Sequence, residues 1–429
     1  MIPATTLPAA TRGDTPAPAP ADLRWFVFAL FFVFGGITSL NDVLIPKLKH
    51  LFELSYFEVL LIQSAFFAAY LLISLPAAAL VKRLGYMRTA VAGLAVMTLG
   101  CLLFIPASMS GVFAAFLGAL FVLAAGITTV QVVTNPLISL LGHPATAHSR
   151  LTFAQAFNSL GTTVAPYVGA IVILGALPTA DPATLDGAAL AAFRTAETRV
   201  IVVTYLVIAA ALALVAAAVW WRRNRLVEPP SAATSLFGSL DLLRRPRFAF
   251  GALGIFVYVG AEVAIGSLLV NFLIQRDAMA IADVDAGKLV ALYWGGAMVG
   301  RFVGAALLRR FAPGGVLAVA AIVAASLCAV AMLTTGDVSG WALLAVGLFN
   351  SIMFPTIFAL ASEGLGDRTA DGSGLICVAI VGGAIVPLAA GLIADAANLR
   401  AALLVPVACY AVIVGFGLFC KRARVQSIA

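Results

Sequence analysis

Long apolar stretches recur along the whole chain and are separated by short polar segments. The first begins at Trp25, where ten consecutive residues to Phe34 are apolar. A helix needs about 20 mostly apolar residues to cross a hydrocarbon layer of about 30 Å. We expect transmembrane helices at about 25–45, 58–81, 87–106, 111–141, 152–176, 199–221, 248–274, 288–308, 314–334, 340–362, 373–396 and 399–420. The pattern predicts an all-α membrane protein with twelve transmembrane helices.

The polar segments divide this chain into two similar parts. The longest polar connection, residues 222–247, separates six predicted helices from six. We therefore expect an N-terminal six-helix half at 25–221, a cytoplasmic linker at 222–247 and a C-terminal half at 248–420. Residues 1–24 hold five prolines among Ala and Thr, which predicts a disordered tail, and 421–429 should form a short cytoplasmic tail. Two six-helix halves suggest a duplicated bundle with a substrate path between the halves.

The basic residues predict the orientation in the membrane. Of the 26 Lys and Arg residues, 18 fall on one side of the twelve predicted helices, and Arg301 lies inside one. The other side carries seven, which are Lys47, Lys49, Arg194, Arg199, Arg276, Lys288 and Arg400. Cytoplasmic loops are enriched in Lys and Arg, so both termini and the linker should be cytoplasmic. The net charge of +7 therefore reflects membrane topology, and we expect no nucleic acid as partner.

Composition and motifs argue against an enzyme. The chain is 62% hydrophobic and 10% charged, and its five cysteines all lie in apolar stretches without a C-x-x-C pair. His50, His143 and His148 lie in loops without the spacing of metal ligands. No G-x-x-x-x-G-K-[ST], G-x-S-x-G or H-E-x-x-H motif occurs. We expect no ATP drive, no metal and no cofactor.

A few ionisable residues nevertheless lie inside the predicted helices. Asn41 and Asp42 follow the apolar run of the first helix, Glu262 lies in the seventh and Arg301 in the eighth. Charged groups in the hydrocarbon are costly and usually face a bundle interior or a water-filled cavity, where they have a function. Asp42 could instead lie at a helix end and meet water, since Pro46 follows. Arg301 could pair with an acid or with helix carbonyls.

The first and seventh helices hold equivalent positions in the two halves, so one acid in each is hard to explain as an accident. We expect Asp42 to carry a coupling proton and Glu262 to bind ligand hydroxyls or to take part in the coupling. Uncharged polar residues accompany the acids in the predicted helices. These are Gln63, Gln131, Asn135, Gln155, Asn158, Asn271, Trp294 and Asn350. Amides and aromatic faces in an apolar pocket would suit a ligand with several hydroxyl groups. Each amide singly could equally hold two helices together.

Two prolines, Pro136 and Pro355, lie within the fourth and tenth predicted helices, again at equivalent positions. Proline removes a backbone hydrogen bond and leaves the carbonyl four residues earlier without its partner. We expect kinks there that act as hinges, with exposed carbonyls facing a cavity.

Residues 76–88, PAAALVKRLGYMR, resemble the loop signature after the second helix of the major facilitator superfamily. Arg83 and Gly85 match, whereas Lys82 stands where that signature usually has Asp. A basic helix end followed by a glycine turn would give a similar loop.

Longer motifs resemble one family within that superfamily, the fucose–galactose–glucose:proton symporters. The resemblance covers about residues 25–420, with the motifs LNDVLIP, IQSAFFAAY, QVVTNPLISLLG, RLTFAQAFNSLGT, YVGAEVAIGSLLVNF, YWGGAMVGRFVG, GLFNSIMFPTIFALA and GSGLICVAIVGGAIVP. It is similar to the bacterial glucose/galactose branch, because the fucose branch has an acid in place of Gln131 and an amide in place of Glu262. The N-acetylglucosamine transporters are close relatives of this branch.

The resemblance also implies site residues. The Asn-Asp pair of the family falls on Asn41 and Asp42, and its Gln and Asn in the fifth helix fall on Gln155 and Asn158. Glu262 is expected to bind sugar hydroxyls or to take part in coupling.

We therefore expect a transporter that imports a glucose- or galactose-type hexose by proton symport across the bacterial inner membrane. Its partners would be the sugar, protons and membrane lipid, and the protein would be a monomer. N-acetylglucosamine or fucose as substrate, and sodium-coupled or passive sugar transport, remain alternatives. A membrane-embedded lipid enzyme or a sugar receptor without transport is the alternative from another class.

Overall fold

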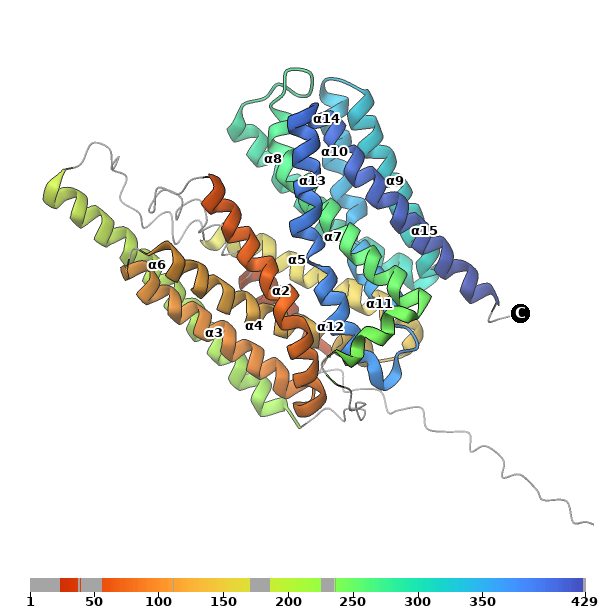
Figure 1. Ribbon diagram of the computed structural model, residues 1–429, viewed down its shortest axis with the longest axis horizontal. Helices are drawn as coiled ribbons and strands as arrows, with labels where there is room; N and C mark the ends of the chain where they lie inside the picture. The colour runs from red at the N-terminus through yellow and green to blue at the C-terminus, as the bar shows by residue number, and fades with distance from the viewer. Residues whose placement is uncertain are drawn as a thin grey trace, which may run out of the picture.

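The computed structural model describes residues 24–37, 39, 56–110, 112–169, 186–224, 235 and 237–426. The described chain is almost entirely helical (Figure 1). The N-terminal bundle consists of the first helix, Arg24–Ile37, with α2 (Tyr56–Leu84), α3 (Tyr86–Ser110), α4 (Phe113–Leu140), η1 (Pro144–Thr146), α5 (Ala147–Gly169) and α6 (Gly187–Arg222). The C-terminal bundle consists of η4 (Gly238–Arg244), α7 (Pro246–Leu273), α8 (Asp283–Arg310), α9 (Pro313–Leu333), α10 (Asp337–Asn350), α11 (Met353–Ser362), η5 (Gly366–Arg368), α12 (Thr369–Ala379), α13 (Gly382–Ala396), α14 (Leu399–Ala402) and α15 (Leu404–Gln426).

Among the described residues, ten helical segments are long and apolar enough to cross a membrane. The described part of the first helix, Arg24–Ile37, is apolar but shorter. Helix α5 occupies the place of the fifth predicted span and carries more polar residues than the others. The ten spans, the first helix and α5 are together consistent with the twelve predicted helices. Large apolar side chains such as Leu214 and Leu392 are more than two-thirds exposed, so these faces require an apolar surrounding such as lipid.

Helix α5 begins at Ala147, five residues before the predicted start, because a basic residue is accommodated in its first turn. The Arg150 guanidinium donates from Nη2 to the Ser139 carbonyl (2.7 Å) and from Nη1 to the His143 carbonyl (2.8 Å). The first bond satisfies a carbonyl in the last turn of α4 that has no partner within the helix, and the second reaches the loop between α4 and η1. A search for apolar stretches alone therefore missed the polar first turn of α5.

The tenth and eleventh predicted spans are each divided into two helices. The tenth consists of α10 and α11, which are separated at Ser351–Ile352, and the eleventh consists of α12 and α13. Pro355 explains the first interruption, because it cannot donate to the Ser351 carbonyl four residues earlier, and the regular pattern resumes where Thr356 N donates to Ile352 O. Pro136, by contrast, lies inside the continuous helix α4.

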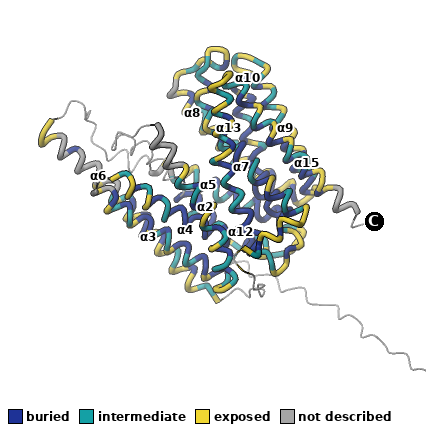
Figure 2. Tube along the Cα trace, viewed as in Figure 1, coloured by how far each residue is buried: buried dark blue, intermediate teal, exposed yellow. Residues whose placement is uncertain are grey.

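The two bundles lie side by side and touch mainly through α2, α4 and α5 of one bundle and α8, α11 and α12 of the other. Helix α12 packs against α2 and α4, and α5 packs against α8 and α11. The contact between α2 and α12 is visible toward the bottom of the view in Figure 1. Helices α4 and α7 are buried along much of their length, whereas α6 presents more exposed positions (Figure 2). The central helices α4, α5, α7 and α8 thus place their polar side chains inside the protein.

Ion pairs join the bundles at one end, which we call the linker end and define by the loop 141–146, the loop 363–368 and η4. Lys82 of α2 pairs with Asp371 of α12 (2.6 Å), and both side chains are less than one-tenth exposed. Arg368 also bonds Asp371 (2.7 Å) and reaches Asp241 of η4 (2.8 Å). These contacts close the linker end and tie it to the segment that enters the C-terminal bundle.

A second pair crosses between the bundles at the same end. His148 Nε2 of α5 lies 2.7 Å from Glu363 Oε1, and Arg247 of α7 bonds the other carboxylate oxygen of Glu363. Burial alone would raise the pKa of Glu363, but the hydrogen bond with His148 and the charge of Arg247 lower it overall. Glu363 therefore stays ionised between its two partners.

Candidate functional site

Polar side chains of α4 and α5 face each other inside the N-terminal bundle. Gln131 and Asn135 are one turn apart on α4, as are Gln155 and Asn158 on α5, so each pair shares one helix face. Gln155 Nε2 donates to Asn135 Oδ1 (3.2 Å), and the Tyr70 hydroxyl of α2 donates to Gln131 Oε1 (2.7 Å). Four of the predicted site residues are therefore on adjacent helices.

The first helix packs tightly against this face of α5. Asn158 Nδ2 donates to the Phe31 carbonyl (3.2 Å), and a Cβ on Gly35 would collide with the Asn158 carbonyl. Only glycine allows such a close approach of two backbones. On the neighbouring α4, Asn135 is fully buried, and its Nδ2 has no hydrogen-bond partner among the described residues.

On the C-terminal side, Glu262 of α7 is half-buried and accepts a hydrogen bond from the Tyr258 hydroxyl (2.8 Å). The two residues are one helical turn apart and therefore lie on the same face of α7. Arg301, on the neighbouring α8, lies near enough for its positive charge to act on the Glu262 carboxyl, although the two side chains form no ion pair. The structure thus brings together the acid and the base that the sequence places inside the spans.

Arg301 also forms hydrogen bonds to groups in both bundles. Its Nε donates to the Ser351 carbonyl (3.2 Å), which is the carbonyl that Pro355 leaves without a helical partner. Its Nη1 donates to the Gln155 carbonyl (3.3 Å) and to the Ser159 hydroxyl, both on α5 of the other bundle. Arg301 therefore bonds helix carbonyls and a hydroxyl, while its charge acts on an acid.

The equivalent proline of the N-terminal bundle behaves in the same way. Pro136 leaves the Val132 carbonyl without a helical donor, and the Ser373 hydroxyl of α12 donates to it across the bundles (2.7 Å). Both carbonyls freed by proline therefore accept bonds at the contact between the bundles. The sequence predicted carbonyls exposed to a cavity at these positions, whereas in the structure each accepts a hydrogen bond from a side chain, Ser373 or Arg301.

Asn350 lies in a separate buried cluster. It is fully buried, its Nδ2 donates to the Tyr293 hydroxyl (2.9 Å), and the Tyr410 hydroxyl donates to its Oδ1 (2.7 Å). Tyr293 and Tyr410 are also fully buried, so Asn350 connects α10 to α8 and α15 in this conformation. Its amide is engaged by protein groups on both sides and reaches no open surface.

Two further predicted residues are exposed. Trp294 is 45% exposed and packs edge-on against Tyr293 (ring centroids 5.1 Å apart), and a Cβ on Gly266 of α7 would lie 3.5 Å from it. Asn271, two and a half turns after Glu262 on α7, is exposed.

Three predicted residues cannot be placed. Asn41 and Asp42 lie outside the described residues, and of Gln63 the structure describes the backbone in α2 but not the side chain.

The sequence reasoning did not find several polar partners that the structure shows. Tyr258 and Ser159 each lie one turn from a predicted residue, Glu262 and Gln155, so helical spacing could have indicated them. Tyr70, Tyr293 and Tyr410 come from helices distant in sequence and carried no such signal.

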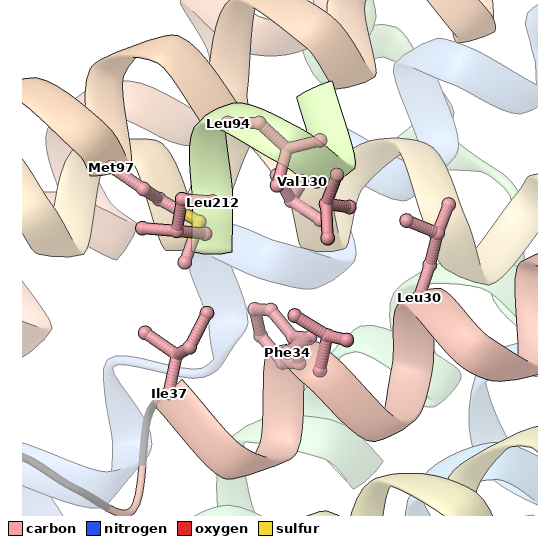
Figure 3. Close-up of a pocket in the computed structure, with 9 residues that line it drawn as sticks. Leu30, Phe34, Ile37, Leu94, Met97, Val130 and Leu212 are labelled. Carbon is pink, nitrogen blue, oxygen red and sulfur yellow. The ribbon is translucent and has the colours of Figure 1, made fainter. Parts of the chain in front are cut away.

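An apolar pocket lies between the first helix, α3, α4 and α6. Figure 3 shows side chains of the first helix facing those of the other three. Its lining consists of Leu30, Val33, Phe34, Ile37, Leu94, Met97, Val130, Leu212 and Val215. No hydrogen-bonding side chain lines it, so a hydroxyl-rich ligand would find no partner there. Within the described part of the chain, no group of three His, Cys, Asp or Glu residues could hold a metal ion.

The bundle of apolar helices with charged groups at its centre defines a multi-pass membrane transporter. The sequence profile described as "Major Facilitator Superfamily" matches residues 26–380, and the chain belongs to this superfamily. The protein is therefore a transporter and not an enzyme.

Within the superfamily, the chain is similar to named sugar transporters over nearly its whole length. It is 50% identical to a glucose/galactose transporter of Brucella abortus (strain 2308), over 92% of this chain and 93% of the other. It is 42% identical to a putative glucose/galactose transporter of Helicobacter pylori (strain J99), over 91% of this chain and 94% of the other. It is 35% identical to the L-fucose-proton symporter of Escherichia coli (strain K12), over 91% of each chain.

Solved structures show the same fold. A crystal structure of the E. coli fucose:proton symporter superposes with a TM-score of 0.85 at 32% identity, over 93% of this chain and 98% of that one. A crystal structure of the same transporter in the outward conformation gives a TM-score of 0.86 at 32% identity, over 93% of this chain and 99% of that one. The major facilitator fold predicted from the sequence is confirmed.

Proposed function

We propose that the protein imports a glucose- or galactose-type hexose by proton symport, through alternating access between the two bundles. The observation that carries the proposal is the 50% identity to a glucose/galactose transporter over 92% of the chain. The arrangement of side chains supports it, because neutral amides face a carboxyl and a guanidinium inside the membrane part. Amides suit hydroxyl groups, and a carboxyl that changes its access to water suits proton coupling.

The proposed roles divide by chemistry. Asp42 carries the coupling proton, and Glu262 takes part in coupling through the effect of its charge on Arg301. The proposed sugar-binding residues are Asn41, Gln63, Gln131, Asn135, Gln155, Asn158, Glu262, Asn271, Trp294 and Asn350. Trp294, which is exposed, offers a stacking face to the sugar ring. Asn350, which two tyrosines hold, would contribute indirectly by fixing α8 and its Trp294.

The proposed location is the bacterial inner membrane, with the protein as a monomer surrounded by lipid and both termini cytoplasmic. The halves would be 25–221 and 248–420, with a cytoplasmic linker at 222–247. The distribution of basic residues supports this orientation. The linker end would then face the cytoplasm, and its ion pairs would close the protein to the inside. Similarity to a structure in the outward conformation agrees with that assignment.

Uptake by purified protein in liposomes tests this function. Labelled glucose and galactose should accumulate against their gradients when the outside is made acidic, and should only equilibrate without a proton gradient. Unlabelled fucose and N-acetylglucosamine, added as competitors, decide between the alternative sugars. Accumulation driven by a sodium gradient, or equilibration under all gradients, would replace proton symport by sodium coupling or passive transport. No uptake of any of these sugars would remove the proposal.

A further inference from the structure

The geometry of α8 points to a role for Arg301 that the similarity to other proteins does not assign. We propose that Arg301 is a positioning residue that couples the charge of Glu262 to the contact between α8 and α5. The inference rests on the proton-coupled transport proposed above. A proton taken up by the C-terminal bundle would thereby weaken the contact between the two bundles.

The first step is the position of Arg301 between the bundles. Its hydrogen bonds to Ser159 and to the Gln155 carbonyl hold α5, and its bond to the Ser351 carbonyl holds the interruption between α10 and α11. One turn further along the same face of α8, the Ala305 carbonyl accepts a bond from the Ser149 hydroxyl of α5 (2.6 Å). Arg301 therefore belongs to the contact that closes the protein on the side of the linker end.

The second step is the balance of charge. All three acceptors that Arg301 bonds are uncharged, so the hydrogen bonds leave its positive charge in place. Among the described residues, the charge that acts between α7 and α8 is that of Glu262. Within the described part of the chain, the other titratable groups beside Glu262 are the phenols of Tyr258 on α7 and Tyr293 on α8, which are neutral near pH 7. The described neighbours on α5 and α10, Ser159, Gln155 and Asn350, carry no charge.

The third step is what protonation does. An ionised Glu262 neutralises Arg301, and the pair is tolerated away from water. When Glu262 takes up a proton, one positive charge remains at the contact between α5 and α8, held by neutral acceptors alone. An unbalanced charge in a low-dielectric interior is strongly unfavourable. Separation of α8 from α5 at the linker end admits water and relieves that cost. Protonation of Glu262 therefore favours opening of the linker end.

Arg301 also reaches a point at which a span can bend. The Ser351 carbonyl lies at the interruption before Pro355, and Arg301 supplies the donor that the proline lacks. When Arg301 moves away from α5, this support of the interruption changes with it. One side chain thus connects the charge on α7, the contact with α5 and the break in the tenth span.

A distance measurement across the linker end tests the inference. Spin labels would be attached at Ala145 of η1 and Asp367 of η5, both exposed, after replacement of the five buried native cysteines by alanine. The full-length protein would be studied in liposomes of phosphatidylethanolamine and phosphatidylglycerol by double electron–electron resonance. In the unsubstituted protein, lower pH should increase the population with the longer distance between the labels.

Four variants separate the contributions. Glu262→Gln mimics the protonated acid and should favour the longer distance at every pH. Arg301→Gln removes the unbalanced charge and should make the distances independent of pH, whereas Arg301→Lys should keep the pH response. The double variant Glu262→Gln with Arg301→Gln should return to the shorter distance. Arg309→Gln, which removes an exposed charge at the end of α8, is the matched control and should behave as the unsubstituted protein.

The inference is overturned if Arg301→Gln keeps the pH response, or if Glu262→Gln still follows pH as the unsubstituted protein does. Should Arg301→Gln fail to fold, the Glu262→Gln and Arg301→Lys distances decide alone. Exchange of labelled for unlabelled glucose, measured in the same liposomes, separates this failure from failure of the proposed function. Exchange without the expected distances contradicts the role of Arg301, whereas absence of exchange in the unsubstituted protein contradicts transport itself.

Discussion

The polar side chains inside the protein, which we call the polar cluster, differ in chemistry between the two bundles. The N-terminal bundle contributes neutral amides from α4 and α5, which bond each other, as Gln155 and Asn135 do. The C-terminal bundle contributes a carboxyl and a guanidinium, Glu262 and Arg301, whose charges act on each other. Among the described residues, the N-terminal side of this cluster is therefore neutral and the C-terminal side is charged.

This difference suggests that the two bundles have separate roles in sugar binding and proton coupling. Neutral amides can donate to and accept from sugar hydroxyls without any change in protonation. A charged pair responds to protons and to the access of water. We expect binding to depend mainly on the N-terminal side and coupling on the charged side, with Asp42 as the residue that could blur the division because it belongs to the first helix.

The largest expected effect is on Asp42. Asp42→Asn keeps the size of the side chain and its capacity for hydrogen bonds but cannot release a proton. Uphill accumulation of sugar should be lost completely, whereas exchange of labelled for unlabelled sugar should persist, because exchange requires no deprotonation. Both are measured in the same liposomes. Accumulation that survives would place coupling on the C-terminal side alone.

A smaller but still large effect is expected at the linker end, where Lys82 of the N-terminal bundle pairs with Asp371 of the other bundle. Asp371→Asn removes the carboxylate that Lys82 and Arg368 share. Loss of one member of a buried ion pair costs about 3–5 kcal/mol, which should open the linker end. Labelling of a cysteine introduced at Ala78, which packs against Gly374 of α12, should become much faster. Sugar affinity of the closed form should not depend on this change, and unchanged labelling would show that the ion pair does not hold the end closed.

Next in size is the loss of one amide on the neutral side. Gln155→Ala should weaken sugar binding by about 1–3 kcal/mol, since the sugar and Asn135 both lose a hydrogen-bond partner. That corresponds to roughly a ten- to hundredfold rise in the dissociation constant, measured by calorimetry. Asn350→Ala is the comparison on the C-terminal side, because it removes an amide held by two tyrosines. Since its contribution is indirect, it should lower the melting temperature and weaken sugar binding less than Gln155→Ala does; a larger loss of affinity than in Gln155→Ala would move binding to the C-terminal side.

The smallest effect concerns pH at the linker end. The pKa of Glu363 lies below its ordinary value of 4.5, because the His148 bond and the Arg247 charge outweigh burial. An acid whose pKa is lowered by folding stabilises the folded state at pH values above its ordinary pKa. This contribution is lost as the pH falls through the lowered pKa. The carboxylate is 43% exposed, so the contribution should be about 1 kcal/mol or less. The difference in melting temperature between the unsubstituted protein and Glu363→Gln should shrink as the pH falls below 4.5. A constant difference down to strongly acidic pH would contradict it.

Much of the fold followed from the sequence for simple reasons. Apolar runs mark spans because every span must be apolar, and the polar segment 222–247 marks the middle of the chain. Pro355 correctly indicated an interruption in the tenth span. The eleventh span breaks directly before Gly382-Gly383, and glycine weakens a helix interior, so a signal was present that the search for apolar runs did not use.

The candidate site could be predicted only in part. Polar residues within apolar helices stand out, so Glu262 and Arg301 were found. How each helix is rotated and which neighbour it meets depends on packing among helices far apart in sequence. The burial of Asn350 between Tyr293 and Tyr410 is therefore a property of three helices that no local pattern records.

The most direct test of the division between binding and coupling is the number of protons that enter with each sugar. Protons and labelled glucose would be counted together in weakly buffered liposomes at saturating sugar. Gln155→Ala should move sugar with the same number of protons as the unsubstituted protein, whereas Glu262→Gln should move fewer protons with each sugar, because Asp42 alone remains to carry them. A changed ratio in Gln155→Ala, or an unchanged ratio in Glu262→Gln, would contradict the account.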